Sequence, residues 1–419
     1  MGLESLRCKE CGADYPLDAR YVCEQCFGPL EVAYDHAGLD AAEAKRKIQA
    51  GSRGIWRYSD FLPFDGGPPA TRSPLEPGLT PLIRADRLAE RLGLGELWVK
   101  NDAANPTHSF KDRVVAVAIA KARQLGFDTV ACASTGNLAN AVAAHAAAAG
   151  LESYVFVPSD LEEQKLLATA VYGTTLVGVR GTYDDVNRLC TQLTETRGWA
   201  FLNVNLRPYY AEGSKTLAYE TVEQLGWSLP DRVVCPIASG SLFTRLGRAF
   251  SEWRDLGLVE GGLPSFNGAQ AGGCDPVAEA YGAEQDVCRP QRPDTIAKSL
   301  AIGDPADGPY ALDLARGTGG AVDSVSDEEI REGIRLLAET TGVFTETAGG
   351  VTTAVLAKLA ERGDIAPDER VVVYITGEGL KTLEATRELF QMHEIDPMPE
   401  QFDELVDREP TVAGSGTVA

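Results

Sequence analysis

The chain contains 419 residues, of which 44% are hydrophobic and 24% are charged, as is usual for a soluble globular protein and unlike disordered or collagen-like chains. At roughly 150 residues per domain, this length predicts two or three structural units. Acidic residues outnumber Lys and Arg by 61 to 39, and the net charge of −22 argues against binding to nucleic acids or to an anionic membrane.

The first 34 residues contain a cysteine pattern typical of a metal ribbon. Two Cys-x-x-Cys pairs, Cys8 with Cys11 and Cys23 with Cys26, are separated by 11 residues. Two such turns can surround one Zn²⁺ with four thiolates, a closed ligand set that predicts a structural ion. A segment this short cannot bury a core of its own, so the metal would stabilise its fold. Two disulfides or an empty ribbon are the alternatives.

Neither a secretory signal nor a transmembrane helix is expected. The N-terminus lacks an apolar signal segment, and no stretch approaches the length of about 18 apolar residues that a membrane-spanning helix needs. The other cysteines are scattered, unlike those of a secreted disulfide framework. We therefore expect a cytoplasmic protein with five unpaired thiols, at Cys132, Cys190, Cys235, Cys274 and Cys288.

Residues 35 to about 78 contain clusters of Gly and Pro and are expected to be irregular. After Thr80, short apolar segments alternate with helical stretches, which predicts an α/β fold with a mostly parallel sheet and helices on both faces. The predicted strands are 97–99, 129–132, 154–157, 176–179, 232–235 and 371–375, and the predicted helices are 114–125, 138–149, 161–171 and 183–193. The tail from residue 405 is expected to be disordered.

The loop 105–113 contains the first candidate for chemistry. We expect Ser109 to cap a helix whose first turn contains Lys111. The helix dipole disfavours a cation there, and a lysine with a lowered pKa suits a Schiff-base amine. The alternative is a solvated lysine beside Asp112 and Arg113.

Three further loops follow predicted strands, where parallel sheets place their ligands. Residues 134–137 include Gly136, which allows a ligand to approach the backbone closely, and the loop 236–242 is rich in small residues. Both precede predicted helices and could bind an anion through N–H groups. Residues 376–381 form the last of these loops. Ordinary turns and helix caps are the alternative interpretation of all three.

Taken together, these motifs resemble those of one family. NPTHSFKDR at 105–113, ASTGN at 133–137, EGSKT at 212–216, GVFTETAGG at 342–350 and TGEGLK at 376–381 are similar to segments of the threonine synthases, a family of pyridoxal-phosphate enzymes with the tryptophan-synthase-β fold. The resemblance spans residues 78–381, and some members carry a similar front ribbon.

The resemblance implies a fold type II enzyme with two mostly parallel-sheet α/β subdomains. It places the ribbon at 1–34 and the catalytic region at 35–404, with the smaller subdomain inserted at about 125–215. It also implies a homodimer. The tail at 405–419 lies outside this architecture.

The resemblance further implies a role for each matching residue. Lys111 would hold pyridoxal phosphate covalently and move the substrate's α-proton, Asn137 would bond the 3-oxygen, and Thr376 would face the pyridine nitrogen. Ser134 and Thr135 would bind the substrate's α-carboxylate. Backbone N–H groups would bind the cofactor phosphate in the loop that comprises Ala238, Ser239, Gly240, Ser241 and Leu242.

The implied reaction converts a small anionic amino acid, O-phospho-L-homoserine, and water to L-threonine and phosphate. However, Tyr209 and Tyr210 stand where commoner members carry an arginine thought to bind the substrate's phosphate, and Arg207 is the nearby substitute. Losing that bidentate contact leaves related reactions open. They are β-replacement on O-phosphoserine, as in cysteate-synthase-like enzymes, and dehydration of threonine or serine. A non-catalytic ribbon protein is disfavoured because the cofactor residues are intact.

Two other residues have competing interpretations. Glu346 would either face the cofactor pocket or stabilise a helix start through its charge. His145 lies on an alanine-rich segment without partners at metal-ligand spacing, which favours a packed core histidine.

Overall fold

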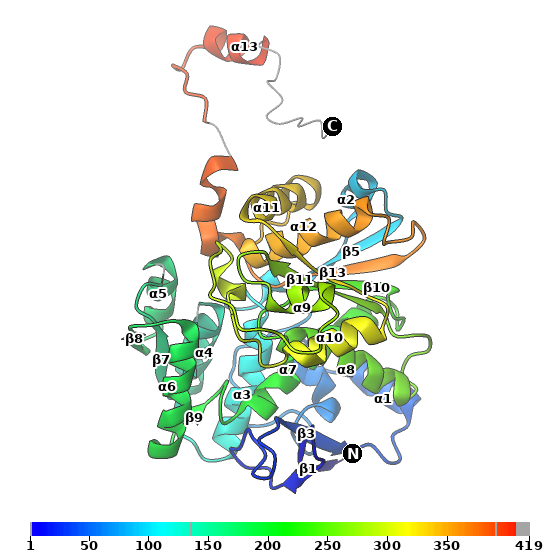
Figure 1. Cartoon of the computed structure of the whole chain (residues 1–419), viewed down its shortest axis with the longest axis vertical. Helices are drawn as coiled ribbons and strands as arrows, with labels where there is room; N and C mark the ends of the chain where they lie inside the picture. Colours follow the sequence, from blue (N-terminus) through cyan, green and yellow to red (C-terminus); the bar gives the residue numbers. More distant parts are fainter. Residues whose placement is uncertain (1, 135, 162, 390–391, 408–419) are drawn as a thin grey trace.

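The computed structural model describes residues 2–134, 136–161, 163–389 and 392–407, and within them it contains three β-sheets (Figure 1). The small N-terminal sheet is antiparallel in the order β2-β1-β3. Its strands are β1 (Gly2–Cys8), β2 (Asp14–Tyr15) and β3 (Leu30–Asp35). Two larger α/β units follow, as the family resemblance implied.

The larger of these units is built on a six-stranded sheet in the order β12-β11-β10-β13-β5-β4. Only the edge strand β4 runs antiparallel to its neighbour. The central strands are almost continuously apolar because both faces are covered. The strands are β4 (Leu82–Arg84), β5 (Glu96–Asn101), β10 (Arg232–Pro236), β11 (Ser265–Ala271), β12 (Val322–Val325) and β13 (Arg370–Ile375).

Helices cover the two faces of this sheet with separate apolar clusters. One face packs against α2 (Asp86–Leu92), α11 (Asp327–Thr341) and α12 (Thr347–Glu361). The other packs against α1 (Ala41–Ala50), α7 (Arg207–Gln224), α8 (Ser241–Asp255), α9 (Pro276–Gly282) and α10 (Gly308–Gly317).

The smaller unit contains a fully parallel four-stranded sheet in the order β8-β7-β6-β9, and it lies to one side of the molecule in Figure 1. The strands are β6 (Thr129–Ala133), β7 (Glu152–Pro158), β8 (Thr175–Val179) and β9 (Ala200–Phe201). The accompanying helices are α3 (Lys111–Gln124), α4 (Asn137–Ala149), α5 (Glu163–Ala170) and α6 (Tyr183–Thr196).

The segment between the ribbon and the first large sheet is more ordered than its Gly and Pro content predicted. It contains α1 and the 3₁₀ helix η1 (Ile55–Phe61). The Asp40 side chain accepts the N–H of Glu43 at the start of α1, and Ala44 and Ile48 pack into the core. A helical face of only two buried residues gave too weak a periodic signal.

The remaining elements are short or peripheral. They are η2 (Asp102–Ala104), η3 (Lys298–Leu300), η4 (Gly379–Leu389) and α13 (Pro399–Asp407). Of the tail predicted to be disordered from residue 405, residues 405–407 are instead helical, as the end of α13, and residues 408–419 lie outside the described residues. Within the described ranges, no helix has the length and apolar character that crossing a membrane would require.

Candidate active site

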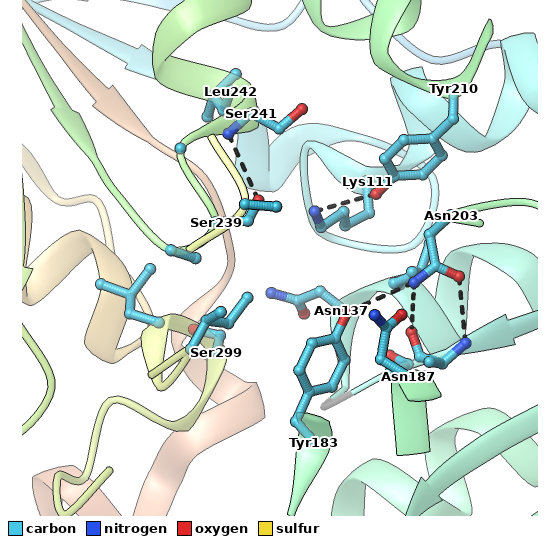
Figure 2. Close-up of a pocket in the computed structure, with 18 of the residues that line it drawn as sticks. Lys111, Asn137, Tyr183, Asn187, Asn203, Tyr210, Ser239, Ser241, Leu242 and Ser299 are labelled. Carbon is cyan, nitrogen blue, oxygen red and sulfur yellow. Dashed lines mark hydrogen bonds between the residues drawn. The ribbon is translucent and has the colours of Figure 1, made fainter. Parts of the chain in front are cut away.

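A cavity of about 260 Å³ lies where loops from both large sheets meet (Figure 2). It opens at the carboxyl ends of the strands, because Ser134 follows β6, Ala238 follows β10 and Thr376 follows β13. The described candidate residues for cofactor and substrate all line it. They are Lys111, Ser134, Asn137, Arg207, Ala238, Ser239, Gly240, Ser241, Leu242 and Thr376. Thr135, also a candidate, lies outside the described residues.

Lys111 begins helix α3 and faces the cavity, which contradicts the alternative of a solvated surface lysine. Burial of the amine lowers its pKa to about 8, although the charge of Glu346 opposes this shift. The helix cap differs from the prediction. Phe110 is the N-cap and its N–H donates to the carbonyl of Thr376 at 2.9 Å, whereas the buried Ser109 hydroxyl has no partner among the described residues.

Tyr210 is the nearest polar partner that the structure gives to Lys111. The amine donates to the Tyr210 hydroxyl at 3.1 Å, and both residues line the cavity (Figure 2). Burial raises the pKa of Tyr210 well above its ordinary value, so the hydroxyl stays protonated. The sequence marked this position as a departure from the family pattern but gave no indication of the contact with Lys111.

The Asn137 amide is held from both sides. Its Nδ2 donates to the two carboxylate oxygens of Glu346 at 2.8 and 3.0 Å, and its Oδ1 accepts from Lys381 Nζ at 2.8 Å. Glu346 is buried on the cavity wall, as one of its two interpretations predicted. Burial raises the pKa of Glu346, and the nearby Lys381 opposes the rise. The sequence assigned no role to Lys381.

The Ser134 side chain lines the cavity and also accepts two backbone hydrogen bonds. Its Oγ accepts the N–H groups of Gly136 at 3.0 Å and Ala139 at 2.8 Å, at the beginning of α4. Both interpretations of this loop therefore apply, since the same hydroxyl supports the helix start and faces the cavity.

The loop from β10 to α8 has the shape of an anion-binding turn. Gly240 has a φ of 91°, and a side chain there would place its Cβ 2.8 Å from the carbonyl oxygen of Asp307. The N–H of Ser241 points to the Ser239 hydroxyl at 3.5 Å. N–H groups at the start of the 15-residue helix α8 lie at the cavity, where they can bind phosphate.

The opposite walls hold polar residues that sequence reasoning missed. Ser299 lies across the cavity from Lys111, and its buried hydroxyl has no partner within the described residues. Asn203 bonds both backbone groups of Ala133, at 3.1 and 3.2 Å, close to Tyr183 and Asn187 (Figure 2). No local motif marks these residues, because they come from segments of ordinary composition.

These features fit pyridoxal phosphate. An amine with a lowered pKa, a helix start for a phosphate, a threonine hydroxyl at Thr376 and the unpartnered Ser299 hydroxyl surround one cavity. A cofactor of this kind needs one covalent anchor and fixed donors for its phosphate, and the Lys111 amine and the N–H groups at the start of α8 are placed where they could serve.

Arg207 lies at the edge of the cavity with its charge already paired. Its Nη2 bonds Asp307 Oδ2 at 2.6 Å, which ties the beginning of α7 to the residue beside Gly240. An anionic substrate would therefore have to share or displace the Asp307 carboxylate to bind this guanidinium.

The cysteine pairs converge as their spacing predicted. The sulfur atoms of Cys8, Cys11, Cys23 and Cys26 lie within 4.8 Å of one another, and none of the four is in a disulfide. The five other cysteines are free and buried, as expected. His145 is also a core residue, with Nε2 at 3.1 Å from Asp112 Oδ1.

Comparison with known proteins gives one family for the region around the cavity. Residues 74–377 match the family model described as "Pyridoxal-phosphate dependent enzyme". A threonine synthase from Methanocaldococcus jannaschii is 38% identical over 382 residues, covering 90% of this chain and 93% of that protein. A threonine synthase from Methanosarcina acetivorans is 37% identical over 379 residues, covering 90% of this chain and 92% of that protein.

Solved structures show the same fold at lower sequence similarity. A diaminopropionate ammonia lyase from Escherichia coli superposes with a TM-score of 0.64 at 18% identity, covering 84% of this chain and 91% of that one. The processed form of threonine deaminase isoform 2 from Solanum lycopersicum superposes with a TM-score of 0.63 at 20% identity, covering 84% of this chain and 90% of that one. The fold type II architecture expected from the motifs is therefore confirmed.

Proposed function

The chain belongs to the pyridoxal-phosphate-dependent enzymes, and we propose that it acts as a threonine synthase, converting O-phospho-L-homoserine and water to L-threonine and phosphate. The observation that carries this proposal is the likeness to threonine synthases at 37–38% identity over 90% of the chain. The cavity supports it, because an amine poised near neutral pH faces an anion-binding loop.

When bound, pyridoxal phosphate supplies an electron sink that stabilises negative charge at the substrate's Cα. Lys111 would anchor it and then carry the α-proton, a task that suits an amine with a pKa of about 8. The N–H groups of the loop 238–242 would hold its phosphate, and Thr376 would offer a hydroxyl to the ring nitrogen. Asn137, fixed by Glu346 and Lys381, would bond the ring oxygen.

The substrate would bind between the walls of the cavity. Ser134 and Thr135 would bind its α-carboxylate, and Arg207 would bind its phosphate. Because water must add only after phosphate has left, loops from both sheets would have to exclude solvent during the early steps. Tyr210 would hold the Lys111 amine in place while the proton moves.

Product analysis tests this proposal directly. The purified protein is incubated with pyridoxal phosphate and O-phospho-L-homoserine, and free phosphate and L-threonine are both measured. Equal amounts of the two products support a threonine synthase. Phosphate with 2-oxobutyrate in place of threonine would instead indicate elimination, and no turnover by a cofactor-loaded protein would favour β-replacement on O-phosphoserine.

The cofactor anchor can be tested separately from the reaction. Borohydride reduction of the holoprotein, followed by peptide mapping, should find the pyridoxyl group on the peptide that contains Lys111. Lys111→Ala should abolish the label and the bound cofactor's visible absorption. A label that persists in this variant would show that another amine is the anchor.

We also propose a metal site, domain boundaries and an oligomeric state for this chain. Cys8, Cys11, Cys23 and Cys26 would hold a structural Zn²⁺, since four convergent sulfur atoms form a closed ligand set. The ribbon would comprise residues 1–34 and the catalytic region 35–404, with an inserted subdomain at about 125–215. A homodimer in the cytoplasm is the proposed state, which light scattering and cell fractionation would check.

A further inference from the structure

The cysteine ribbon supplies a residue to the cavity wall. Tyr21 lies between Cys11 and Cys23, and it lines the cavity together with Lys111 and Arg207. It also packs against the apolar cluster of the four-stranded sheet that contains Phe201. The ribbon is therefore in contact with the smaller α/β unit at the point where its aromatic residue reaches the candidate active site.

The backbone around Tyr21 is fixed by the ribbon itself. The carbonyl of Tyr21 accepts the N–H of Leu30 at 3.2 Å, and Val22 and Pro29 form an antiparallel bridge. Cys23, one of the four clustered cysteines, follows two residues later. The position of the Tyr21 ring is thus coupled through a very short length of chain to the geometry of the cysteine cluster.

The same loop is bonded to the helix that carries Tyr210. The buried Tyr209 hydroxyl donates to the carbonyl of Asp18 at 3.0 Å. Its neighbour Tyr210 accepts from Lys111 at 3.1 Å. Two adjacent residues of α7 therefore contact the ribbon on one side and the candidate cofactor anchor on the other.

Charged contacts hold the ribbon against the larger unit. Glu31 of β3 pairs with Arg245 at 2.8 Å and also with Arg248, both on α8. Although burial would raise its pKa, these arginines lower the pKa of Glu31 to about 2, so the carboxylate is charged at neutral pH. The Nζ of Lys9 lies 3.1 Å from the centre of the ring of Tyr310, and Tyr310 is three residues after Asp307 in the chain. The ribbon thus docks beside the Arg207–Asp307 pair.

A small space continues this wall behind Arg207. It is lined by residues of the ribbon and of the catalytic region together, including Lys9, Tyr21, Arg207 and Asp307. At about 10 Å³ it can hold no more than one water, so the two parts are closely packed there. The cavity wall is consequently continuous from Tyr21 to Arg207.

We propose that Tyr21 binds the phosphate end of the substrate beside Arg207, which makes the cysteine ribbon part of the active site. The choice of ligand rests on the proposed threonine synthase activity, whereas the position of Tyr21 does not. A phenol hydroxyl can donate to a phosphate oxygen, and Tyr21 lines the cavity on the same side as Arg207. Tyr21 supplies a neutral donor where Arg207 is already shared with Asp307.

Substitution of Tyr21 tests this assignment in the full-length, cofactor-loaded protein. Tyr21→Phe removes only the hydroxyl, and Tyr21→Ala removes the wall. Phe27→Ala is the matched control, because Phe27 belongs to the same ribbon but is 78% exposed and does not line the cavity. Zinc content and Tm are measured for every variant, so that an effect on the ribbon's fold is recognised.

Two readouts keep this proposal separate from the proposed reaction. The KM for O-phospho-L-homoserine should rise about tenfold in Tyr21→Phe with kcat within about twofold, as expected from the loss of one hydrogen bond to a charged group. The Kd of inorganic phosphate, measured by calorimetry, should rise similarly. Phe27→Ala should change neither value.

The outcomes are distinct. If the wild-type protein makes no threonine but Tyr21→Phe still weakens phosphate binding, the proposed reaction fails and the role of Tyr21 stands. If both Tyr21 variants keep wild-type zinc content and Tm and also bind phosphate and substrate as Phe27→Ala does, the proposal for Tyr21 is overturned.

Discussion

The amine of Lys111 lies 3.1 Å from the hydroxyl of Tyr210, although the two residues are 99 positions apart in the chain. Lys111 begins α3 and Tyr210 belongs to the first turn of α7, so the packing of these helices creates the contact. Because burial keeps the phenol protonated, Tyr210 provides a neutral partner that orients the amine without fixing its charge.

Replacing this hydroxyl should slow the reaction more than it weakens binding. For Tyr210→Phe we expect kcat to fall about tenfold with KM within about twofold, because a misplaced amine affects proton transfer rather than substrate contacts. The pH profile of kcat should also change shape. Tyr374→Phe is the control, since that buried hydroxyl bonds Thr221 and does not line the cavity. Equal losses in kcat for both variants would contradict a specific role for Tyr210.

The charge of Glu346 should set the pH at which Lys111 becomes a free amine. Burial lowers the pKa of Lys111 to about 8, and Glu346 opposes this, so Glu346→Gln should lower it further. The rate at which the apoprotein incorporates pyridoxal phosphate, measured from its absorption against pH, should then reach half-maximum at lower pH than in the wild type.

The control for this shift is Glu361→Gln, at the exposed end of the helix that Glu346 precedes. It should leave the half-maximum near pH 8. A midpoint in Glu346→Gln that is unchanged, or that moves to higher pH, would show that Glu346 does not act on the Lys111 amine through its charge.

A buried ion network beneath the site should be essential for stability. Arg113 contacts Asp102 at 2.7 Å and Glu220 at 2.9 Å, and Lys100 joins the same carboxylate of Glu220. Arg113→Met leaves the buried Asp102 without its ion-pair partner and Glu220 with Lys100 alone, and we expect a loss of about 3–5 kcal/mol in the free energy of unfolding. Urea denaturation, followed by circular dichroism, measures it.

Arg84→Met provides the comparison, because Arg84 pairs with Asp86 at an exposed site. This substitution should lower the free energy of unfolding by no more than about 1 kcal/mol. If the two substitutions destabilise the protein equally, the buried network does not hold β5, α3 and α7 together as their contacts indicate.

The cysteine cluster should bind one zinc ion per chain. Cys26→Ser removes one of four ligands and should lower the zinc content, measured by atomic emission, together with the Tm. Cys288→Ser alters a cysteine outside the cluster and should retain the full zinc content. Wild-type protein that carries no metal after purification in zinc-containing buffer, and whose four ribbon thiols all react with a thiol reagent, would contradict the proposed site.

Local signals in the sequence predicted which loops could carry chemistry, and the family resemblance implied the role of each residue. Alternating apolar and helical segments gave the parallel sheets, since strands covered on both faces read as continuous apolar runs. Small residues after those strands marked the loops at Ser134, Ser239 and Thr376, and the structure brings all three to one cavity. The paired spacing of the cysteines predicted their convergence, because a Cys-x-x-Cys turn determines its own geometry.

Two helices begin at positions that local sequence signals did not predict. Ser109 has the side chain of a cap, but the structure uses Phe110, whose N–H bonds the carbonyl of Thr376. Helix α1 lies in a segment whose Gly and Pro clusters predicted irregular chain, and its stability comes from packing of Ala44 and Ile48. In both cases a distant segment outweighed the local preference.

By itself, then, the sequence determined much of the strand–helix alternation, the loops that reach the cavity and the convergence of the four cysteines, because each depends on neighbours within a few residues. Only the tertiary structure decided which side chains meet across the cavity. The contacts of Lys111 with Tyr210 and of Asn137 with Glu346, and the place of Tyr21 on the wall, join segments that are far apart in the chain. Such contacts arise from the packing of whole sheets and helices, which no local pattern encodes.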